Sequence, residues 1–549
     1  ELRGKTRINL QEPQTSLFAN ISKLHVNQEG IVYLMEGLTG KVPNIMKNLQ
    51  FIDFQGTTQG TLNNLRADGL LETKAGILHA DVTMEIDSEY NRSYSGTLSS
   101  SDLDLGILTG DLKKYGITDF DITLNGFNYR NKYPESSIKG AIHFIEYNNY
   151  QYEGITLDGI YKDGGFNGNL SLDDDNLSVQ VNGAFNVTQP LPVFNLEAIV
   201  KHLKPNELNL SDKHTETDLS FKLTADFIGS SIDNLNGQIR LDSLTLNAPN
   251  NQGYFLDKLT ITAGQVEDGK ELRLQSSFMN ALVKGNFTYQ TIPSSILSTM
   301  QQYIPSLITL NENYQRPNNN FKFDIRIENT DLFEKVFHLP IHIDMPATLK
   351  GYFYDKDGRI KIEGQFPRIN YNGTQYESAT LFCDNPSNQI NCLLRGSMLM
   401  KSGAMLNLSL KTNAMEDKLA TLLNWGNNTD VTYGGEVNAI TRFSKTEGTN
   451  PLLQADIDIL PTTMILNDTI WNIKSAHIGL DSGYVSIDNL QIGKTGKYLR
   501  INGKISDRES DSCLIDLKDI NVKYVLDILR FDDVEFGGMA TGVTNLKNI

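Results

Sequence analysis

Apolar and polar residues alternate along much of the chain, and this period of two constrains the fold more than any other feature. In residues 78–86 every second side chain is apolar, and the same pattern returns at 219–227, 321–327 and 406–410. Successive side chains of a β-strand point to opposite faces of its sheet. Each segment therefore predicts a strand with one apolar and one polar face.

Turn signals separate these segments. Gly, Asp and Asn tolerate the backbone angles of tight turns. Such residues cluster at Asp163–Gly165, Asp173–Asn176, Ala248–Asn251 and Asp355–Gly358. Strand plus turn recurs roughly every 10 to 15 residues, which is typical of a repeat architecture. Turns this short favour antiparallel pairing between neighbours in the sequence.

The pattern runs on without the Pro-rich, Ser-rich or charged linkers that separate sandwich domains. We therefore expect one continuous repetitive unit over residues 1–549, with a weak seam at 291–320 that would give halves 1–310 and 311–549. A long sheet must bury its apolar face. The predicted fold is all-β, an elongated, curled β-sheet groove (β-taco-like) of many short amphipathic strands with a few short helices. A right-handed parallel β-helix is the competing shape.

Helical pattern is scarce. Ile292–Leu310 predicts a helix that is capped by Ser294 or Ser295 and ends before Pro305. Two shorter helices are predicted at 414–423 and 522–529.

Charge and hydropathy exclude several classes of function. The chain has 49 Lys and Arg against 66 Asp and Glu, a formal net charge of −17, so it would repel nucleic acid. No segment reaches the roughly 18 to 20 apolar residues of a membrane-spanning helix. Alternation is already present at Thr6–Leu10 and continues at Gly542–Leu546, which indicates a piece of a longer protein.

The three cysteines are too few for a disulfide scaffold. Cys383 and Cys392 flank the turn-like residues 385–388, so they can face each other across a hairpin, and an oxidising compartment would permit a bridge. Two unpaired strand cysteines are the alternative. Cys513 is expected to be a lone buried thiol.

Candidate catalytic and metal-binding residues are weak. His338 and His342 are separated by a proline and so cannot form a helical metal pair; surface strand histidines are the favoured interpretation. Asp173–Asp175 lack the Gly and Glu spacing of a calcium loop and are expected to form a solvated turn. Asp102 and Asp104 would need a sugar-binding cleft to act as glycosidase carboxylates, and the chain has only two Trp. Phosphate loops and nucleophile motifs are absent, so we expect no enzyme, no cofactor and no metal.

Four segments resemble a known family. Gly154–Tyr161 followed by Phe166–Leu177 resembles a repeat of the TamB-like translocation and assembly proteins of Bacteroides-type bacteria, and Leu466–Trp471 and Leu499–Ser506 are similar to later repeats of that family. The resemblance spans most of the chain and lies in the order of the motifs.

The resemblance implies a periplasmic protein of the AsmA-like, bridge-like lipid-transfer group that is anchored in the inner membrane and acts in outer-membrane biogenesis. The expected partners are phospholipid acyl chains and, through parts with no counterpart in these residues, the inner membrane and a TamA-like outer-membrane barrel. Phospholipid would move along the apolar face, and the alternative is a scaffold or chaperone-like adaptor for outer-membrane proteins that acts by strand addition. The predicted lining residues are Leu78, Val82, Met84, Ile86, Leu219, Phe221, Leu223, Phe227, Phe321, Phe323, Ile325, Ile327, Leu406, Leu408 and Leu410.

Overall fold

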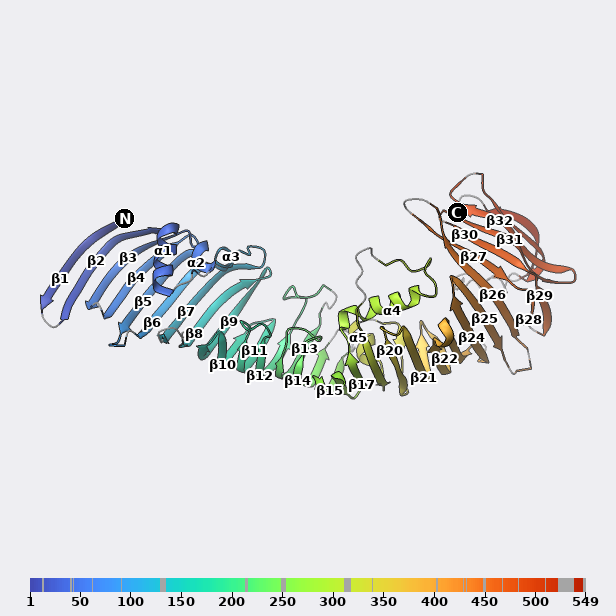
Figure 1. The fold of residues 1–549 in the computed structure, drawn as a ribbon, viewed down its shortest axis with the longest axis horizontal. Coiled ribbons are helices and arrows are strands. Elements are labelled where there is room, and N and C mark those ends of the chain that lie inside the picture. Colours follow the sequence, from blue (N-terminus) through green and yellow to red (C-terminus); the bar gives the residue numbers. More distant parts are fainter. Residues whose placement is uncertain are drawn as a thin grey trace. The chain divides into compact units, whose positions relative to one another are not determined.

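The fold is known from a computed structural model that describes two compact units, Glu1–Ala263 and Gly264–Ile549 (Figure 1). Their description omits residues 12–13, 40–41, 43, 62, 90, 129–134, 213–215, 248–252, 311–316, 338, 401–402, 428, 431, 448–450, 467, 482, 509, 522–537 and 547–549. The seam predicted at 291–320 falls within the second unit and stays a prediction.

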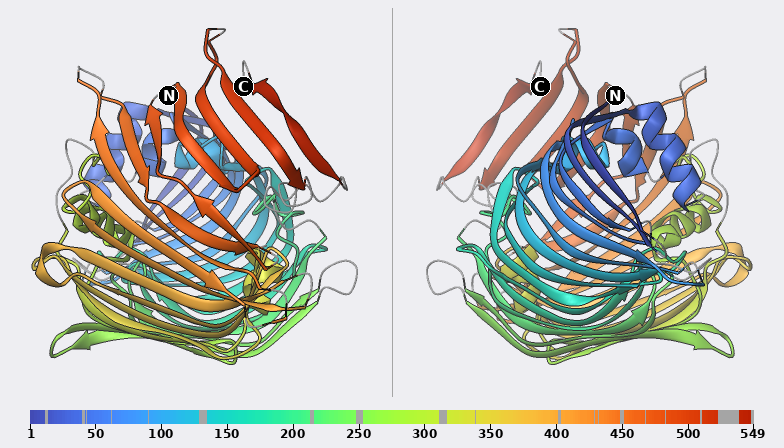
Figure 2. Two further views of the ribbon diagram at one scale, coloured as in Figure 1. Left: turned by 90° about the vertical axis from the view of Figure 1, so that its right-hand side faces the viewer. Right: turned by 90° about the vertical axis from the view of Figure 1, so that its left-hand side faces the viewer.

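The first unit is an antiparallel sheet in which each strand pairs with the next in sequence. Figure 2 shows its strands, blue to teal, bending along their length so that the sheet curls. The strands are β1 (Leu2–Gln11), β2 (Gln14–Asn27), β3 (Phe51–Thr61), β4 (Asn64–Thr73), β5 (Gly76–Ile86), β6 (Arg92–Asp104), β7 (Tyr115–Asn128), β8 (Glu135–Tyr147), β9 (Tyr150–Lys162), β10 (Gly165–Asp173), β11 (Leu177–Asn186), β12 (Val193–Leu203), β13 (Asp218–Ile228), β14 (Asn236–Asn247) and β15 (Tyr254–Val266), and the helices are α1 (Gln28–Thr39), α2 (Asn44–Asn48) and α3 (Leu105–Thr109).

The second unit is also an antiparallel sheet. Most strands pair with their sequence neighbours, but β27 and β28 both pair with β26, and β30 and β29 continue from them to β31. The strands are β16 (Gly269–Ser276), β17 (Met279–Asn286), β18 (Asn320–Ile327), β19 (Ile341–His342), β20 (Ala347–Tyr354), β21 (Arg359–Tyr371), β22 (Thr374–Asp384), β23 (Ile390–Leu399), β24 (Met405–Met415), β25 (Lys418–Gly426), β26 (Gly434–Lys445), β27 (Leu453–Ile459), β28 (Thr462–Leu466), β29 (Thr469–Ile473), β30 (Ala476–Asp481), β31 (Tyr484–Lys494), β32 (Lys497–Ser506), β33 (Cys513–Asn521) and β34 (Met539–Leu546), and the helices are η2 (Tyr289–Thr291), α4 (Ile292–Gln301), α5 (Asp331–Phe337) and η3 (Pro386–Asn388).

The all-β fold and the curled sheet predicted from the alternation are confirmed. Every strand pair within the described parts of the two units is antiparallel, which excludes the parallel β-helix there. The predicted turns at 163–165, 173–176 and 355–358 are present, and the fourth, at 248–251, lies outside the described residues.

One predicted helix is present with different ends. Helix α4 begins at Ile292 but ends at Gln301 rather than before Pro305. Neither predicted serine caps it: Thr291 occupies the N-cap position without a side-chain hydrogen bond, and Ser295 is buried inside the helix. The Ser295 hydroxyl instead donates to Asp355 at 3.0 Å.

The helix predicted at 414–423 is wrong. These residues form the end of β24, a turn and the start of β25. Glu416 and Asp417 both have positive φ, 51° and 60°, as required by the tight turns that match the twist of antiparallel strands. Pairing with β23 on one side and β26 on the other overrides the local helix preference. The helix predicted at 522–529 lies outside the described residues.

Candidate functional site

Strand pairing aligns aromatic side chains in a row across the first unit. Residues directly opposite each other in paired strands point to the same face of the sheet. We call the following set the aromatic row: Tyr161, Phe166, Phe185, Phe194 and Phe227 from β9 to β13. The rings of Phe194 and Phe227 lie 4.8 Å apart between centroids, and those of Phe166 and Phe185 lie 5.7 Å apart. The row runs perpendicular to the strands.

Two further rows lie beside it on the same face, which we call the apolar face. The glycine row is Gly159, Gly168, Gly183, Leu196 and Ala225. The leucine row is Leu157, Leu170, Val181, Ala198, Leu223, Leu241 and Leu259. In β9, β10 and β11 the glycine row therefore has no side chains, and the large apolar side chains of the aromatic and leucine rows lie on either side of it.

The register brings together lining residues that were predicted from separate segments. Successive pairings place Met84 opposite Tyr94, then Gly126, Ser136 and finally Tyr161 of the aromatic row. Met84 and Phe227 are therefore in one row, although 143 positions separate them in the sequence. Val82 reaches the glycine row by the same four pairings, and Leu223 belongs to the leucine row.

The second unit has rows of the same kind. Ile325 and Leu410 share one row, connected through Leu349, Gly364, Leu381 and Leu394. A second row contains Phe323, and its other members are Val283, Gly351, Ile362, Cys383, Cys392 and Thr412. A third row contains Leu408, and its other members are Gly396, Trp425, Gly435, Met464 and Trp471.

One margin of the apolar face of the first unit is covered by other parts of the chain. Helices α1, α2 and α3 pack around Ile31, Leu49 and Leu103 and against Leu78 and Phe120 of the sheet (Figure 1). Further along, Leu208 of the β12–β13 connection is fully buried against residues that include Ile155 and Leu172. These segments cover the sheet near the ends of its strands and do not pack on the aromatic, glycine or leucine row.

In the second unit residues 289–310, which we call the strap, cover a margin. Ile292 and Ile296 of α4 pack on Phe321, Phe353 and neighbouring residues, and Tyr303 and Ile304 pack on Ala414. Side chains at successive hairpin turns hold the strap in place. The hydrogen bonds are Ser295 to Asp355 at 3.0 Å, Asn385 to Tyr303 at 2.7 Å, the Ser306 amide to Asp417 at 2.7 Å and Lys445 to Thr309 at 2.9 Å.

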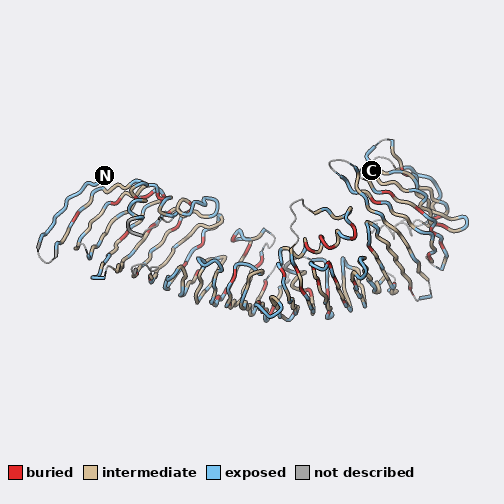
Figure 3. The backbone as a smooth tube through the Cα atoms, in the orientation of Figure 1, coloured by how far each residue is buried: buried red, intermediate tan, exposed pale blue. Residues whose placement is uncertain are grey.

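The predicted lining residues are mostly half-buried. Phe321 and Leu406 are buried, Met84 is 37% exposed, and the other twelve are intermediate. Figure 3 shows few buried positions among strands that mostly alternate between intermediate and exposed. Core-facing positions of a closed sandwich would be buried. Intermediate exposure indicates side chains that pack against row neighbours while their tips stay uncovered.

A hollow of about 310 Å³ lies over β10, β11 and β12. Its floor is Gly168 and Gly183 of the glycine row, and Phe166, Phe185 and Phe194 of the aromatic row stand on one side. Every residue that lines it is apolar or glycine; the others are Leu170, Val181, Val187 and Leu196. The hollow can exchange water for apolar groups but offers no side-chain hydrogen bond.

The apolar face projects little at several glycines, because these residues have no side chain and a neighbouring aromatic ring occupies the space where one would lie. A methyl group added to Gly351 would come within 2.9 Å of the Phe323 ring, and one added to Gly364 within 2.7 Å of the Phe366 ring. Gly159 stands in the same relation to the Phe166 ring. Rings that cover a glycine of the same strand, as Phe366 does, or of the next strand stabilise the sheet without projecting far from it.

The opposite face, the polar face, carries paired charges. Arg66 donates two hydrogen bonds to Asp81, at 2.6 and 2.7 Å, and Lys139 lies 2.9 Å from Asp158. A larger hollow, of about 870 Å³, lies over β7 to β12 and is lined mainly by side chains of this face. Lys139 and Asp158 already pair within it. The polar face therefore suits water and ions rather than hydrocarbon.

Protonation of His477 on the polar face should depend on Asp458. Its Nδ1 lies 2.9 Å from Asp458 Oδ1, and this hydrogen bond, with the nearby carboxylates, raises the pKa of His477. The unfolded pKa is about 6.5, so the stabilisation is fully present below that pH and is lost as pH rises through the folded pKa. Asp458→Asn should return the His477 pKa toward about 6.5 in an NMR titration of the ring. An unchanged pKa would contradict the assignment of the cause.

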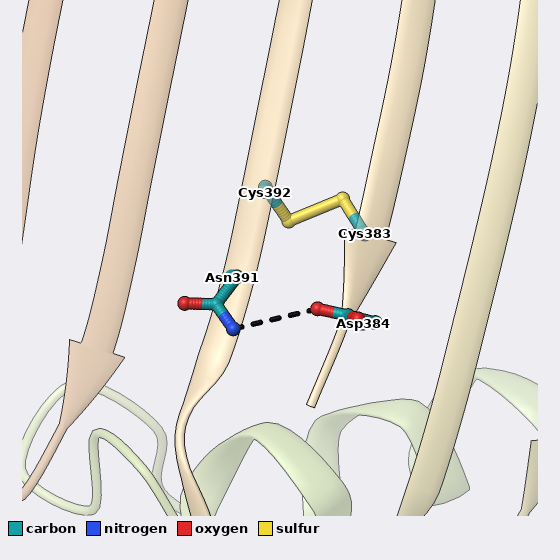
Figure 4. Close-up of a disulfide and its surroundings, with 4 residues drawn as sticks. All are labelled: Cys383, Asp384, Asn391 and Cys392. Atoms are coloured by element: carbon teal, nitrogen blue, oxygen red, sulfur yellow. Dashed lines mark hydrogen bonds between the residues drawn. A yellow bond between two sulfur atoms is a disulfide. The ribbon is translucent and has the colours of Figure 1, made fainter. Parts of the chain in front are cut away.

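A disulfide joins Cys383 and Cys392, which are directly opposite in β22 and β23 with Cα atoms 4.2 Å apart (Figure 4). It lies on the apolar face, in the row of Phe323. The next pair, on the polar face, is Asp384 and Asn391, whose amide donates to the carboxylate at 3.4 Å. Cys513 is free and fully buried, and burial raises the pKa of its thiol.

Counting reactive thiols tests this arrangement. Because Cys513 is buried and the other two cysteines are bonded, the native protein should react with iodoacetamide very slowly. Unfolding without reductant should expose one thiol, and unfolding with reductant all three, as counted by mass spectrometry. A Cys513→Ala variant should show no reactive thiol when unfolded without reductant and two when unfolded with it. Three reactive thiols without reductant would contradict the bond.

Two of the weak aspartate candidates have ordinary local roles. Asp104 caps α3 by accepting a hydrogen bond from the Ile107 amide at 2.8 Å. Asp174 accepts from the Asn176 amide at 2.9 Å in the predicted turn. His342 forms a pair with Glu334, and His338 lies outside the described residues.

Periodicity alone missed the residues that form the hollow. Phe166, Leu170 and Val181 were not among the predicted lining residues because glycines interrupt the apolar alternation in β10 and β11. A signal was present: each glycine occupies a position where the alternation calls for an apolar side chain. Glycine within an alternating segment is therefore evidence of a low point on the apolar face.

No family model, no curated protein and no solved structure matches the chain. Among the described residues, no helix combines the length and the apolar character needed to span a membrane.

Proposed function

We propose that this chain is part of a periplasmic bridge that conducts phospholipid between the inner and outer membranes, with acyl chains lying on the apolar face of each unit. The observation that carries the proposal is the set of uncovered apolar rows with an apolar hollow among them. Covering such a face stabilises it, and an acyl chain supplies the cover that a second sheet supplies in a sandwich.

The rows also support movement. Each buried CH₂ contributes roughly 0.8 kcal/mol, so a long tail gains enough to leave water. Neighbouring strands are about 4.8 Å apart, and along the leucine row each step presents another aliphatic side chain. Successive positions therefore differ little in binding free energy, which favours sliding over trapping.

The proposed compartment is supported by the disulfide. Bonds of this kind persist in oxidising compartments such as the periplasm and are rare in the cytosol.

Site-specific photo-crosslinking in cells tests the proposal. A crosslinking amino acid at Phe185, inside the hollow, should capture phospholipid, and the same residue at Gln180, exposed on the polar face of the same strand, should not. Equal labelling at both positions would contradict an apolar track. Capture of unfolded outer-membrane proteins in place of lipid at Phe185 would favour the adaptor instead.

A further inference from the structure

The connection between β18 and β20 brings two carboxylates and an imidazole together. Asp331 and Glu334 are three residues apart in α5 and so share one side of the helix. His342 is in β19, and its Nδ1 lies 2.7 Å from Glu334 Oε1. One ligand atom from each of the three residues lies within 4.8 Å of the other two.

A buried threonine holds the two elements in this geometry. Thr330 is 6% exposed, and its hydroxyl lies 2.8 Å from Glu334 Oε1 and accepts a hydrogen bond from the Ile343 amide at 2.8 Å. The Thr330 amide donates to the Ile343 carbonyl at 3.1 Å. The start of α5 and the strand with His342 are thus fixed to each other, as in metal sites whose ligands are oriented by hydrogen-bonded neighbours.

Other histidine pairs do not converge in this way. His143 contacts Asp119 through Nδ1 at 2.8 Å and Asp121 through Nε2 at 3.8 Å, so the ring separates its two carboxylates. His25 contacts Asp53 at 2.6 Å. Within the described ranges, Asp331, Glu334 and His342 are the one group of three or more His, Cys, Asp or Glu residues whose ligand atoms meet.

We propose that Asp331, Glu334 and His342 bind a divalent transition-metal cation of the Zn²⁺ type. Imidazole nitrogen and carboxylate oxygen are ligands that Zn²⁺ takes at about 2.0 to 2.2 Å. The cation takes the place of the proton between His342 and Glu334. Their side chains are 46% and 32% exposed, which leaves room for water to complete the coordination. Bound metal would fasten α5 to β19 beside the end of β21, where His342 pairs with Asn370.

Calorimetric titration of the metal-free full chain with zinc chloride tests the site. We expect one saturable site in the native protein. Asp331→Asn keeps the His342–Glu334 pair and should weaken zinc binding at least about tenfold. Glu334→Gln should do the same. Even substitutions of residues that only hydrogen-bond to metal ligands lower metal affinity about 10- to 100-fold. His25→Gln is the matched control, because His25 has a carboxylate partner but no third ligand, and its affinity should equal that of the native chain.

Absence of saturable binding would overturn the proposal. So would equal affinity in the native chain and in both ligand variants, since zinc would then bind elsewhere. Thermal unfolding of each variant without metal guards against misfolding: the Asp331→Asn chain should melt near the native temperature without zinc and lose the upward shift that zinc gives the native chain. A shift of native size in that variant would also contradict the site.

Discussion

Replacing Leu170 by Asp should reduce the crosslinking of phospholipid at Phe185 by at least about tenfold, since a carboxylate removed from water costs several kcal/mol and each 1.4 kcal/mol is a factor of ten. Leu170 is half-buried, and it lines the same hollow as Phe185. An acyl chain in the hollow would cover the new carboxylate and remove its water. Total co-purified phospholipid, measured by mass spectrometry, should fall less, because other rows keep their apolar side chains.

Asn167→Asp is the matched control for this substitution. Asn167 is exposed on the polar face of the same strand and lies opposite Ile160 and Ala184, so the added charge meets no like charge directly across the sheet. Its crosslinking yield should equal that of the unsubstituted protein. A normal yield in the Leu170→Asp protein, with the fold intact by circular dichroism, would show that the hollow does not hold the tail.

Gly183→Ala should loosen the sheet around β11. Gly183 has φ of +139°, a backbone conformation that residues with a Cβ rarely adopt. An added methyl group would meet the Asn195 carbonyl oxygen and lie 2.6 Å from the Leu196 Cα, both of them backbone atoms of β12. Strain of this kind costs roughly 1–3 kcal/mol, so amide hydrogen exchange in β11 and β12 should speed up roughly five- to hundredfold.

Gly542→Ala provides the control. Gly542 lies in β34, and a methyl group there would have no heavy atom within 4 Å. Exchange near it should change little. If both substitutions left exchange unchanged, the close approach of the β12 backbone to Gly183 would not exclude a side chain at that position.

The local pattern predicted individual strands well and failed where partners decide. Alternation over 78–86 and 406–410 corresponds to β5 and β24, because a period of two fits a half-buried strand and does not fit a helix. The helix predicted at 414–423 failed because pairing on both sides outweighs a weak helix preference. Helix α1 was not predicted, although Asn27 caps it by accepting from the Gly30 amide at 3.0 Å.

The candidate site was predicted only in part. Alternation identified which side chains share a face within one strand, so Val82 and Met84, or Phe323 and Ile325, were predicted together. It did not identify which strands would align them in rows, nor that Phe321 would be covered by α4, since both depend on contacts between distant segments. The group of Asp331, Glu334 and His342 also required the tertiary structure, because α5 and β19 are brought together by the hydrogen bonds of Thr330.

By itself, the sequence determined that this chain forms strands with one apolar face, because side-chain direction alternates along any extended backbone and needs no partner. Only the tertiary structure decided which part of that face is open. Register and the position of the strap arise from contacts between separate segments of the chain. Those contacts leave the hollow between Phe185 and Leu170 uncovered while they bury Phe321 and Leu208.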